Sequence, residues 1–188
     1  MDAEHVAADL ESVLLTPDQI AERVAALATT LAADHAGRIP VLVGVLAGAA
    51  TFTVDLARAY PGQVEIGWMA IKSYSTRNRA SGSVRLLKDL DLDIEDRDVI
   101  IVECVIDTGL TMNWLIGNLR QRRPRSVAVC ALMRRPDTPS FGDTPSYIGC
   151  DVEHGLIVGY GLDYQGHYRN LSCAAILAPQ VRTAVAAR

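Results

Sequence analysis

The residues best suited to chemistry lie in one stretch of the chain, from Asp98 to Met112. An apolar run there is typical of a buried strand, and it carries two carboxylates, Glu103 and Asp107, to the end of that strand. In open α/β sheets, ligands bind at the carboxyl ends of the strands. The next residues, Thr-Gly-Leu-Thr at 108–111, lead into an expected helix. We therefore expect a ligand site where this strand ends.

The turn at 108–111 has the properties of a phosphate site that uses no lysine. Gly109 allows the backbone to approach a ligand closely, and the free N–H groups at a helix start bind anions. The hydroxyl groups of Thr108 and Thr111 add further donors. Carboxylates beside such a turn suit a phosphorylated substrate that carries hydroxyl groups and a metal ion. The alternative is a plain helix cap formed by the Asp and Thr side chains.

Strand-like and helix-like patterns alternate along the chain and would position this site. Thr16, Pro17 and Gln19 form a capping-box sequence, and apolar residues at helical spacing continue to Leu31. Strands are predicted at 41–46, around 64–68, at 99–102 and at 127–132, and further helices at about 49–60 and 111–122. This order predicts an α/β fold with a parallel, doubly wound sheet flanked by helices.

The composition restricts the class of protein. With 188 residues, 49% of them hydrophobic, we expect one domain over residues 1–188 rather than a disordered chain. A formal charge of −4 argues against nucleic acid as the main ligand. Neither a signal-peptide pattern nor a long uncharged apolar run occurs, so a cytoplasmic protein without a membrane partner is expected. The four widely spaced cysteines fit neither disulfides nor a zinc site.

Two connections are not explained by the predicted sheet. The polar stretch at 73–82 lies between strand-like segments, and it is either a solvated hairpin loop or a mobile lid. The stretch at 137–146 is rich in Pro, Thr and Gly, and we expect it to be an ordinary surface loop.

Several segments together resemble the type I phosphoribosyltransferase family, and in particular its hypoxanthine-guanine branch. The resemblance covers about residues 13–177 and is carried by VLVGVLAGAATFTVDLARA at 41–59, SY at 73–74, SGSVRLLKDLD at 81–91, VIIVECVIDTGLT at 99–111 and IVGYGLDYQGHYRNL at 157–171. The last segment is specific to the hypoxanthine-guanine branch, whereas the segment at 99–111 is shared by the wider family.

The resemblance implies a fold and an activity. The fold would be a parallel twisted sheet with a small hood formed by the terminal segments and a lid at 73–82. The activity would be transfer of 5-phosphoribose from 5-phosphoribosyl 1-pyrophosphate (PRPP) to N9 of a 6-oxopurine, with release of pyrophosphate and a requirement for Mg²⁺. A homodimer or homotetramer is the expected assembly.

By resemblance, the segment at 99–111 supplies the general base and the ribose phosphate site. Asp107 would act as the general base for the proton of the purine's imidazole ring, and its charge would stabilise the oxocarbenium-like sugar. Glu103 would accept hydrogen bonds from the ribose hydroxyls and help to bind the metal. The 5′-phosphate would be held by Thr108, Gly109, Leu110 and Thr111.

Other matched positions surround the remaining parts of the substrates. Asp163 matches a carboxylate beside a second Mg²⁺ and near the base, and Arg169 matches the guanidinium that neutralises pyrophosphate. Ala47 and Gly48 match the pyrophosphate loop. Ser73 and Tyr74 match the lid, which would exclude water and so prevent hydrolysis of the activated sugar.

The chain also departs from the family pattern. Cys104 replaces the second member of an acidic pair, so either a ribose contact is lost or the thiol faces the core. Ala47 stands where the pyrophosphate loop usually has lysine. In the base site, Arg134 is matched with the lysine that donates to the 6-oxo oxygen, and Leu156, followed by Ile157, with the aromatic residue that stacks on the base.

These departures leave alternatives open. The substrate is either hypoxanthine or guanine, or a modified purine of a specialised pathway. A non-catalytic regulator that binds PRPP, a nucleotide or RNA is the alternative from another class. The acidic net charge argues against RNA, and retention of Asp107 argues against loss of catalysis.

Overall fold

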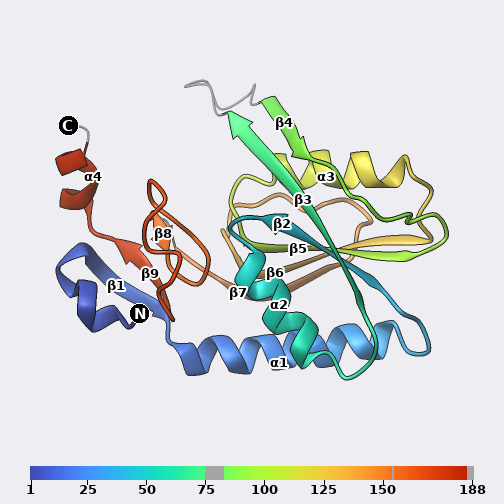
Figure 1. Cartoon of the computed structure of the whole chain (residues 1–188), viewed down its shortest axis with the longest axis horizontal. Helices are drawn as coiled ribbons and strands as arrows, with labels where there is room; N and C mark the ends of the chain where they lie inside the picture. Colours follow the sequence, from blue (N-terminus) through green and yellow to red (C-terminus); the bar gives the residue numbers. More distant parts are fainter. Residues whose placement is uncertain (75–82, 154, 186–188) are drawn as a thin grey trace.

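The structure of the chain is a computed structural model that describes residues 1–74, 83–153 and 155–185. Its main part is a six-stranded sheet with strand order β4-β3-β2-β5-β6-β7 (Figure 1). The strands are β2 (Val41–Leu46), β3 (Glu65–Tyr74), β4 (Ser83–Lys88), β5 (Asp98–Ile106), β6 (Ser126–Arg134) and β7 (Ser146–Asp151). Strands β3, β2, β5, β6 and β7 are parallel, and β4 is antiparallel to β3. The predicted parallel sheet therefore carries one antiparallel edge strand.

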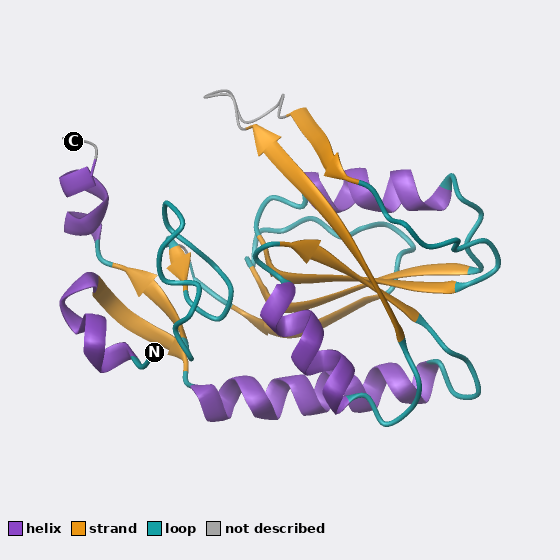
Figure 2. Cartoon of the chain, viewed as in Figure 1, coloured by secondary structure: helices purple, strands orange, loops and turns teal. Residues whose placement is uncertain are grey.

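The helices cover the sheet on both faces. α1 (Pro17–Asp34) and α2 (Ala50–Ala59) lie on one face, and α3 (Leu110–Arg120) lies on the other (Figures 1 and 2). The predicted capping box begins α1, because the Gln19 N–H donates to Thr16 Oγ1 over 3.3 Å and the Thr16 N–H donates to Gln19 Oε1 over 2.9 Å. The fold class predicted from the sequence is confirmed.

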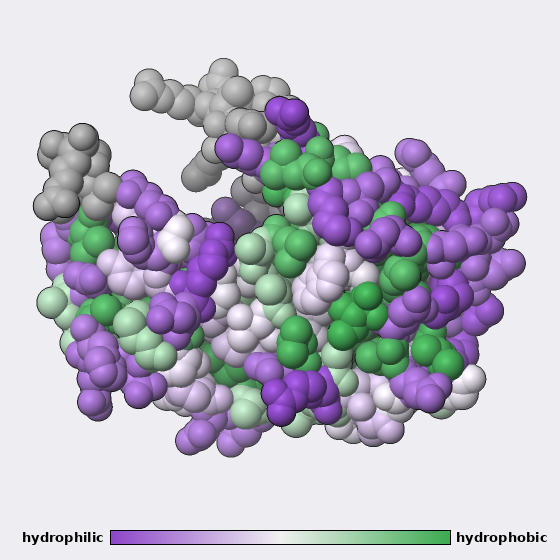
Figure 3. Space-filling model, viewed as in Figure 1, coloured by the Kyte–Doolittle hydropathy of each residue, from purple (hydrophilic) through white to green (hydrophobic). Residues whose placement is uncertain are grey.

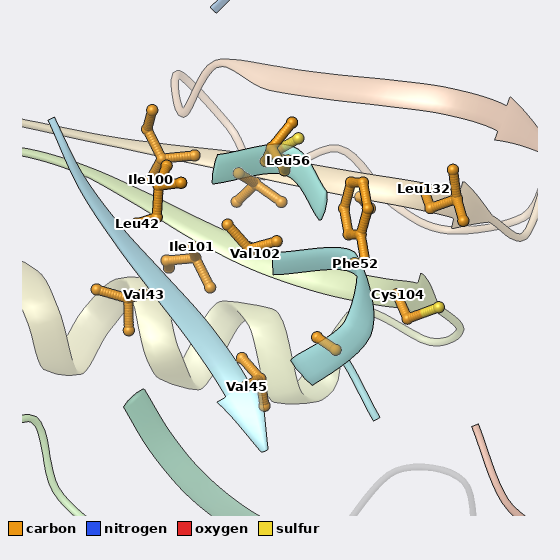
Figure 4. Packing of buried hydrophobic residues seen from close by; sticks show 14 of the residues in the cluster. Leu42, Val43, Val45, Phe52, Leu56, Ile100, Ile101, Val102, Cys104 and Leu132 are labelled. Carbon is orange, nitrogen blue, oxygen red and sulfur yellow. The ribbon is translucent and has the colours of Figure 1, made fainter. Parts of the chain in front are cut away.

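The core lies where the central strands meet the helices. Residues 41–43 of β2 and 99–102 of β5 are fully buried, as their uncharged runs predicted (Figure 4). Phe52 and Leu56 of α2 pack against them from one face. Burial of each such side chain stabilises the fold by about 1.5–3 kcal/mol, so the central strands form a rigid base for the loops at their ends.

A second, smaller sheet forms the expected hood from the terminal segments. It has the order β1-β9-β8, with β1 (Leu10–Leu15), β8 (Ile157–Val158) and β9 (Ala174–Leu177), all antiparallel. A 3-10 helix, η1 (Ala3–Asp9), precedes β1, and α4 (Pro179–Val185) follows β9 (Figure 1). Hydrophilic side chains cover much of this part in Figure 3.

The expectations for the lid, the cysteines and membrane-spanning helices can also be compared with the structure. The predicted lid at 73–82 lies, from residue 75 onward, outside the described residues, and the backbone of Tyr74 pairs with Ser83 where β3 ends and β4 begins. All four cysteines are free thiols, as their spacing predicted. Within the described ranges, no helix has the length and apolar character needed to span a membrane.

Candidate functional site

The site is assembled where β2 and β5 end. These two strands are parallel neighbours, so the loops that follow them emerge at the same edge of the sheet. The first loop contains Ala47 and Gly48 and leads into α2, and the second runs from Asp107 to Gly109 and leads into α3. A third loop, after β8, contacts the first: a Cβ atom at Gly161 would lie 2.5 Å from the Gly48 carbonyl oxygen. Only glycine allows this approach.

The turn after β5 has the geometry of an anion site. Gly109 has a φ of +74° and directly precedes α3, whose first N–H groups have no partner within the helix. Thr108 and Leu110 are exposed, Thr111 is half-buried, and the Leu110 N–H donates to Thr108 Oγ1 over 3.4 Å. A pocket of about 170 Å³ lies beside this turn, lined by Glu103, Val105, Ile106, Asp107, Gly109, Thr111 and Met112. The two predicted carboxylates and the turn are thus together.

The two carboxylates of this pocket have different surroundings. Asp107 is 74% exposed, and Arg135 Nε lies 3.8 Å from its Oδ1. Glu103 is half-buried and accepts one hydrogen bond, from the Cys104 N–H at 2.9 Å. Burial raises the pKa of Glu103 from its usual 4.5 to about 8, because that single hydrogen bond offsets little of the lost hydration. A cation bound beside Glu103 would favour its ionised form.

Cys104 does not occupy the position expected of a ribose-binding residue. Its side chain is fully buried in the core beside Phe52 (Figure 4), and the thiol donates to the Tyr160 carbonyl oxygen over 3.8 Å. Successive side chains of a strand point to opposite faces of the sheet, so Cys104 faces away from the pocket that Glu103 lines. Burial also raises the pKa of the thiol, which is therefore neutral. The alternative raised from the sequence, a core cysteine, is correct.

Arg134 is also misplaced for the base contact expected of it. It ends β6 beside Asp151 of β7, and the two form a paired contact, Nε to Oδ1 at 2.8 Å and Nη2 to Oδ2 at 3.2 Å. The next residue, Arg135, lies by Asp107 instead. Its side chain is only 10% exposed, Nη2 donates to the Gly155 carbonyl oxygen over 2.5 Å, and Nη1 is buried without a partner among the described residues.

The position of Arg135 follows from where the strand ends. Pairing between β6 and β7 stops at Arg134 and Asp151, and the Arg135 N–H donates to the carbonyl oxygen of Ile106, one residue before Asp107. Arg135 was not among the residues expected at the base from the sequence. The only signal was the Arg-Arg doublet, in which either residue could have matched the family's lysine.

Of the other residues expected at the base, Leu156 and Ile157 belong to hydrophobic clusters, and Asp163 lies on the loop after β8. The Ile157 side chain is 6% exposed and packs in the main core, and Leu156 is half-buried and packs against the core of the hood. Neither lines the 170 Å³ pocket. The Ile157 side chain is therefore not available to a base, because β8 holds it against β9.

The loop after β8 brings together the charges predicted for the pyrophosphate and metal side. Arg169 Nη2 lies 2.6 Å from Asp163 Oδ1, and Arg169 Nη1 donates to the Gly161 carbonyl oxygen over 2.6 Å. The Gly166 N–H donates to Asp163 Oδ2 over 2.7 Å. Because Gly161 touches Gly48, these charges belong to the same assembly as the β2–α2 loop. Ala47 is exposed and contributes no charged side chain.

The stretch at 137–146, expected to be an ordinary surface loop, contacts the site. Thr138 Oγ1 donates to the Asp107 carbonyl oxygen over 2.5 Å. Phe141 is buried, and its ring would lie 3.1 Å from a Cβ at Gly109. The loop therefore supports the anion-binding turn. Its composition alone gave no sign of this, since only the buried Phe141 is unusual for a solvated loop.

A larger groove of about 690 Å³ is lined by residues of α1, of α2 and of the loop after β8. Its lining includes Thr51, Asp55 and Arg58 of α2, and Tyr160 and Arg169 of the loop after β8. It shares Arg169 with the site described above, but it contains neither Glu103 nor Asp107. Ser73 and Tyr74 form the end of β3, and their role in a lid stays a prediction.

Comparison with known proteins agrees with this geometry. The sequence matches the model of the phosphoribosyl transferase domain over residues 14–165. The hypoxanthine-guanine phosphoribosyltransferase of Mycobacterium avium is 46% identical over 185 residues, which cover 95% of this chain and 91% of the relative. The Bacillus subtilis (strain 168) protein of the same name is 35% identical over 173 residues, covering 92% and 96%.

Solved structures give the same result. The crystal structure of a hypoxanthine phosphoribosyltransferase from Staphylococcus aureus has a TM-score of 0.87 and 34% identity, covering 94% of this chain and 96% of that one. The chain belongs to the phosphoribosyltransferase family. Within that family, the similarity is to the hypoxanthine-guanine phosphoribosyltransferases, over nearly the whole of their length.

Proposed function

We propose that this protein is a purine phosphoribosyltransferase that transfers 5-phosphoribose from PRPP to N9 of hypoxanthine or guanine and releases pyrophosphate, as in purine salvage. The observation that carries the proposal is the pocket in which Asp107 and Glu103 lie beside the Gly109 turn. Relatives named for this activity, 35–46% identical over most of the chain, support it.

Each part of PRPP, the 5′-phosphate, the ribose and the pyrophosphate, would be bound by a different part of the site. The N–H groups at the start of α3 and the hydroxyl groups of Thr108 and Thr111 would bind the 5′-phosphate. Glu103 would accept hydrogen bonds from the ribose hydroxyls. The Gly48 backbone and the Arg169 guanidinium would bind the pyrophosphate. The positive charge of Arg169 would stabilise the negative charge that develops on the pyrophosphate as it leaves.

On the purine side, the Asp107 carboxylate would accept the proton that the imidazole ring loses as N9 bonds to C1 of the ribose. Its exposed position at the pocket allows a base to reach it. Arg135, rather than Arg134, would donate to the 6-oxo oxygen, because its buried Nη1 has no partner among the described residues. A base with an acceptor at C6 would satisfy this guanidinium, whereas the amino group of adenine would not.

The requirement for Mg²⁺ fits the donors that are present. Among the described residues, no group of three or more His, Cys, Asp or Glu side chains could hold a metal. Mg²⁺ is commonly held by one or two carboxylates together with phosphate oxygens and water, so Glu103 would suffice as the protein ligand of one ion and Asp163 as that of a second. When bound, the ions would neutralise charge on the pyrophosphate.

A panel of bases tests the proposal. Hypoxanthine, guanine, xanthine, adenine and a set of modified purines are incubated separately with PRPP, Mg²⁺ and the protein, and nucleotide and pyrophosphate are both measured. We expect equal amounts of the two products with hypoxanthine or guanine and none with adenine, and we expect Asp107→Asn to abolish most of the turnover. Product only with a modified purine would support the specialised enzyme, and PRPP binding without any product would support the non-catalytic regulator. Light scattering of the same sample tests the expected homodimer or homotetramer.

A further inference from the structure

Tyr160 occupies an unusual backbone position between the hood and the candidate pyrophosphate loop. It has a φ of +48°, and its neighbours Gly159 and Gly161 have φ values of +92° and +97°. A Cβ at Gly159 would lie 2.1 Å from the Cys173 carbonyl oxygen, and one at Gly161 would lie 2.5 Å from that of Gly48. A left-handed conformation is unfavourable for a tyrosine, so the contacts of this residue must hold it there.

Those contacts join separate parts of the site. The Tyr160 hydroxyl donates to Asp55 Oδ2 of α2 over 2.7 Å, and its N–H donates to the Leu171 carbonyl oxygen over 3.0 Å. Its own carbonyl oxygen accepts from the buried Cys104 thiol of β5. The side chain itself is only 6% exposed. Tyr160 thus connects α2 and β5 with the part of the loop after β8 that carries Arg169.

We propose that Tyr160 is a positioning residue for pyrophosphate, acting through its hydrogen bond to Asp55; this inference rests on the proposed function. The bond fixes α2, which begins just after the Gly48 loop, against the loop that presents Gly161 and Arg169. Asp55 and Arg169 also line the same 690 Å³ groove. Without the Tyr160 hydroxyl, Asp55 loses the hydrogen bond that joins α2 to the loop carrying Arg169. The position of Arg169 relative to Gly48 would then be less defined.

A second tyrosine provides a matched control. The Tyr147 hydroxyl of β7 donates to Asp34 Oδ2 of α1, also over 2.7 Å. Tyr147→Phe and Tyr160→Phe therefore remove the same kind of bond between a tyrosine and an aspartate. Neither side chain is expected to touch a substrate. Only Tyr160, however, lies on the loop after β8, which also carries Arg169, the residue expected to bind pyrophosphate.

The experiment measures kcat, KM for PRPP, KM for hypoxanthine and the dissociation constant of pyrophosphate for both variants. For Tyr160→Phe we expect KM for PRPP and the pyrophosphate dissociation constant to rise about five- to tenfold. This is less than the full effect of losing a hydrogen bond to a charged group, because the bond lies within the protein and acts on the ligand only through the position of Arg169. KM for hypoxanthine should stay within about twofold, and Tyr147→Phe should change none of these quantities. Asp55→Asn keeps an oxygen acceptor and should retain most of the PRPP affinity, whereas Asp55→Ala should behave like Tyr160→Phe.

Two results would overturn the inference. One is an equal effect of Tyr160→Phe and Tyr147→Phe, and the other is a parallel change of both KM values and kcat, which indicates a general structural loss. Direct binding of pyrophosphate and PRPP separates this failure from failure of the proposed function. A wild-type protein that binds PRPP but does not transfer it still allows the comparison, and one that binds neither ligand refutes both proposals.

Discussion

The two ends of β5 carry carboxylates in opposite surroundings. At its start, Asp98 is almost fully buried, and its oxygens accept from Ser126 Oγ at 2.6 Å, Arg125 Nη1 at 3.1 Å and Arg38 Nη1 at 3.3 Å. At the other end, Asp107 is 74% exposed with one guanidinium 3.8 Å away. One strand thus holds a carboxylate whose hydrogen-bonding capacity is used within the protein and another whose capacity is left for a ligand.

The regions around these two ends differ in the same way. Near the start of β5, the chain forms further ion pairs, between Arg97 and Glu65 at 2.8 Å and between Arg123 and Glu95 at 2.8 Å. Near its end lie a carboxyl group with a raised pKa and a guanidinium with a buried nitrogen that has no partner in the described parts of the chain. Incompletely satisfied polar groups are costly to a fold, and they are concentrated where substrates bind. The comparison predicts that substitutions at the start of β5 change stability and those at its end change activity.

The largest effect is expected at Asp98. Asp98→Ala removes three hydrogen bonds to a buried carboxylate, from Arg38, Arg125 and Ser126, and their loss should cost about 3 kcal/mol. The free energy of unfolding, measured in urea, should fall by about that amount, while kcat at a temperature where the protein is folded should be unchanged. A loss of kcat in fully folded protein would contradict the assignment of Asp98 to stability.

Asp107→Asn should show the opposite behaviour. Loss of a general base lowers kcat by about 10²-fold, whereas removing the charge of an exposed side chain changes the free energy of unfolding by less than about 0.5 kcal/mol. Steady-state kinetics and urea unfolding on the same preparation measure both quantities. Near-normal turnover in this variant would exclude Asp107 as the general base.

Cys104→Asp tests whether the residue beside Glu103 belongs to the pocket or to the core. Sequence comparison suggests that an aspartate here restores an acidic pair and lowers KM for PRPP. The buried position predicts instead a loss of about 2 kcal/mol in the free energy of unfolding and no gain in PRPP affinity. Cys104→Ala, measured alongside, separates the effect of the carboxylate from that of lost packing. A lower KM for PRPP in Cys104→Asp would show that the new carboxylate reaches the ribose.

The last prediction concerns the pH dependence of stability at Glu103. Its pKa is about 8 in the folded protein and near 4.5 when unfolded, so between these values the folded state binds the extra proton. Its contribution to stability is therefore present at low pH and lost as pH rises toward 8. Glu103→Gln should remove this part of the decline when unfolding is compared at pH 5 and pH 8 without metal or PRPP. An unchanged pH profile would show that Glu103 is ionised throughout.

The α/β fold and the central part of the site could be predicted from local patterns in the sequence. The capping box at Thr16, the buried runs of β2, β5 and β6, and the Asp107–Thr111 turn are local patterns. Each is specified by a few neighbouring residues, through helix capping, burial and the conformation of glycine. Such patterns predict the same local structure wherever the segment lies in a fold, because they depend only on neighbouring residues.

Tertiary structure alone decided which side chains face the pocket. Cys104 and Arg134 were each given a ligand contact from sequence, and each points elsewhere because one residue along a strand changes the face of the sheet. The contacts of Arg135 with Asp107, of Thr138 with the Asp107 backbone and of Tyr160 with Asp55 join distant segments. No local pattern encodes these contacts, because they depend on where the strands end and how the loops beyond them pack.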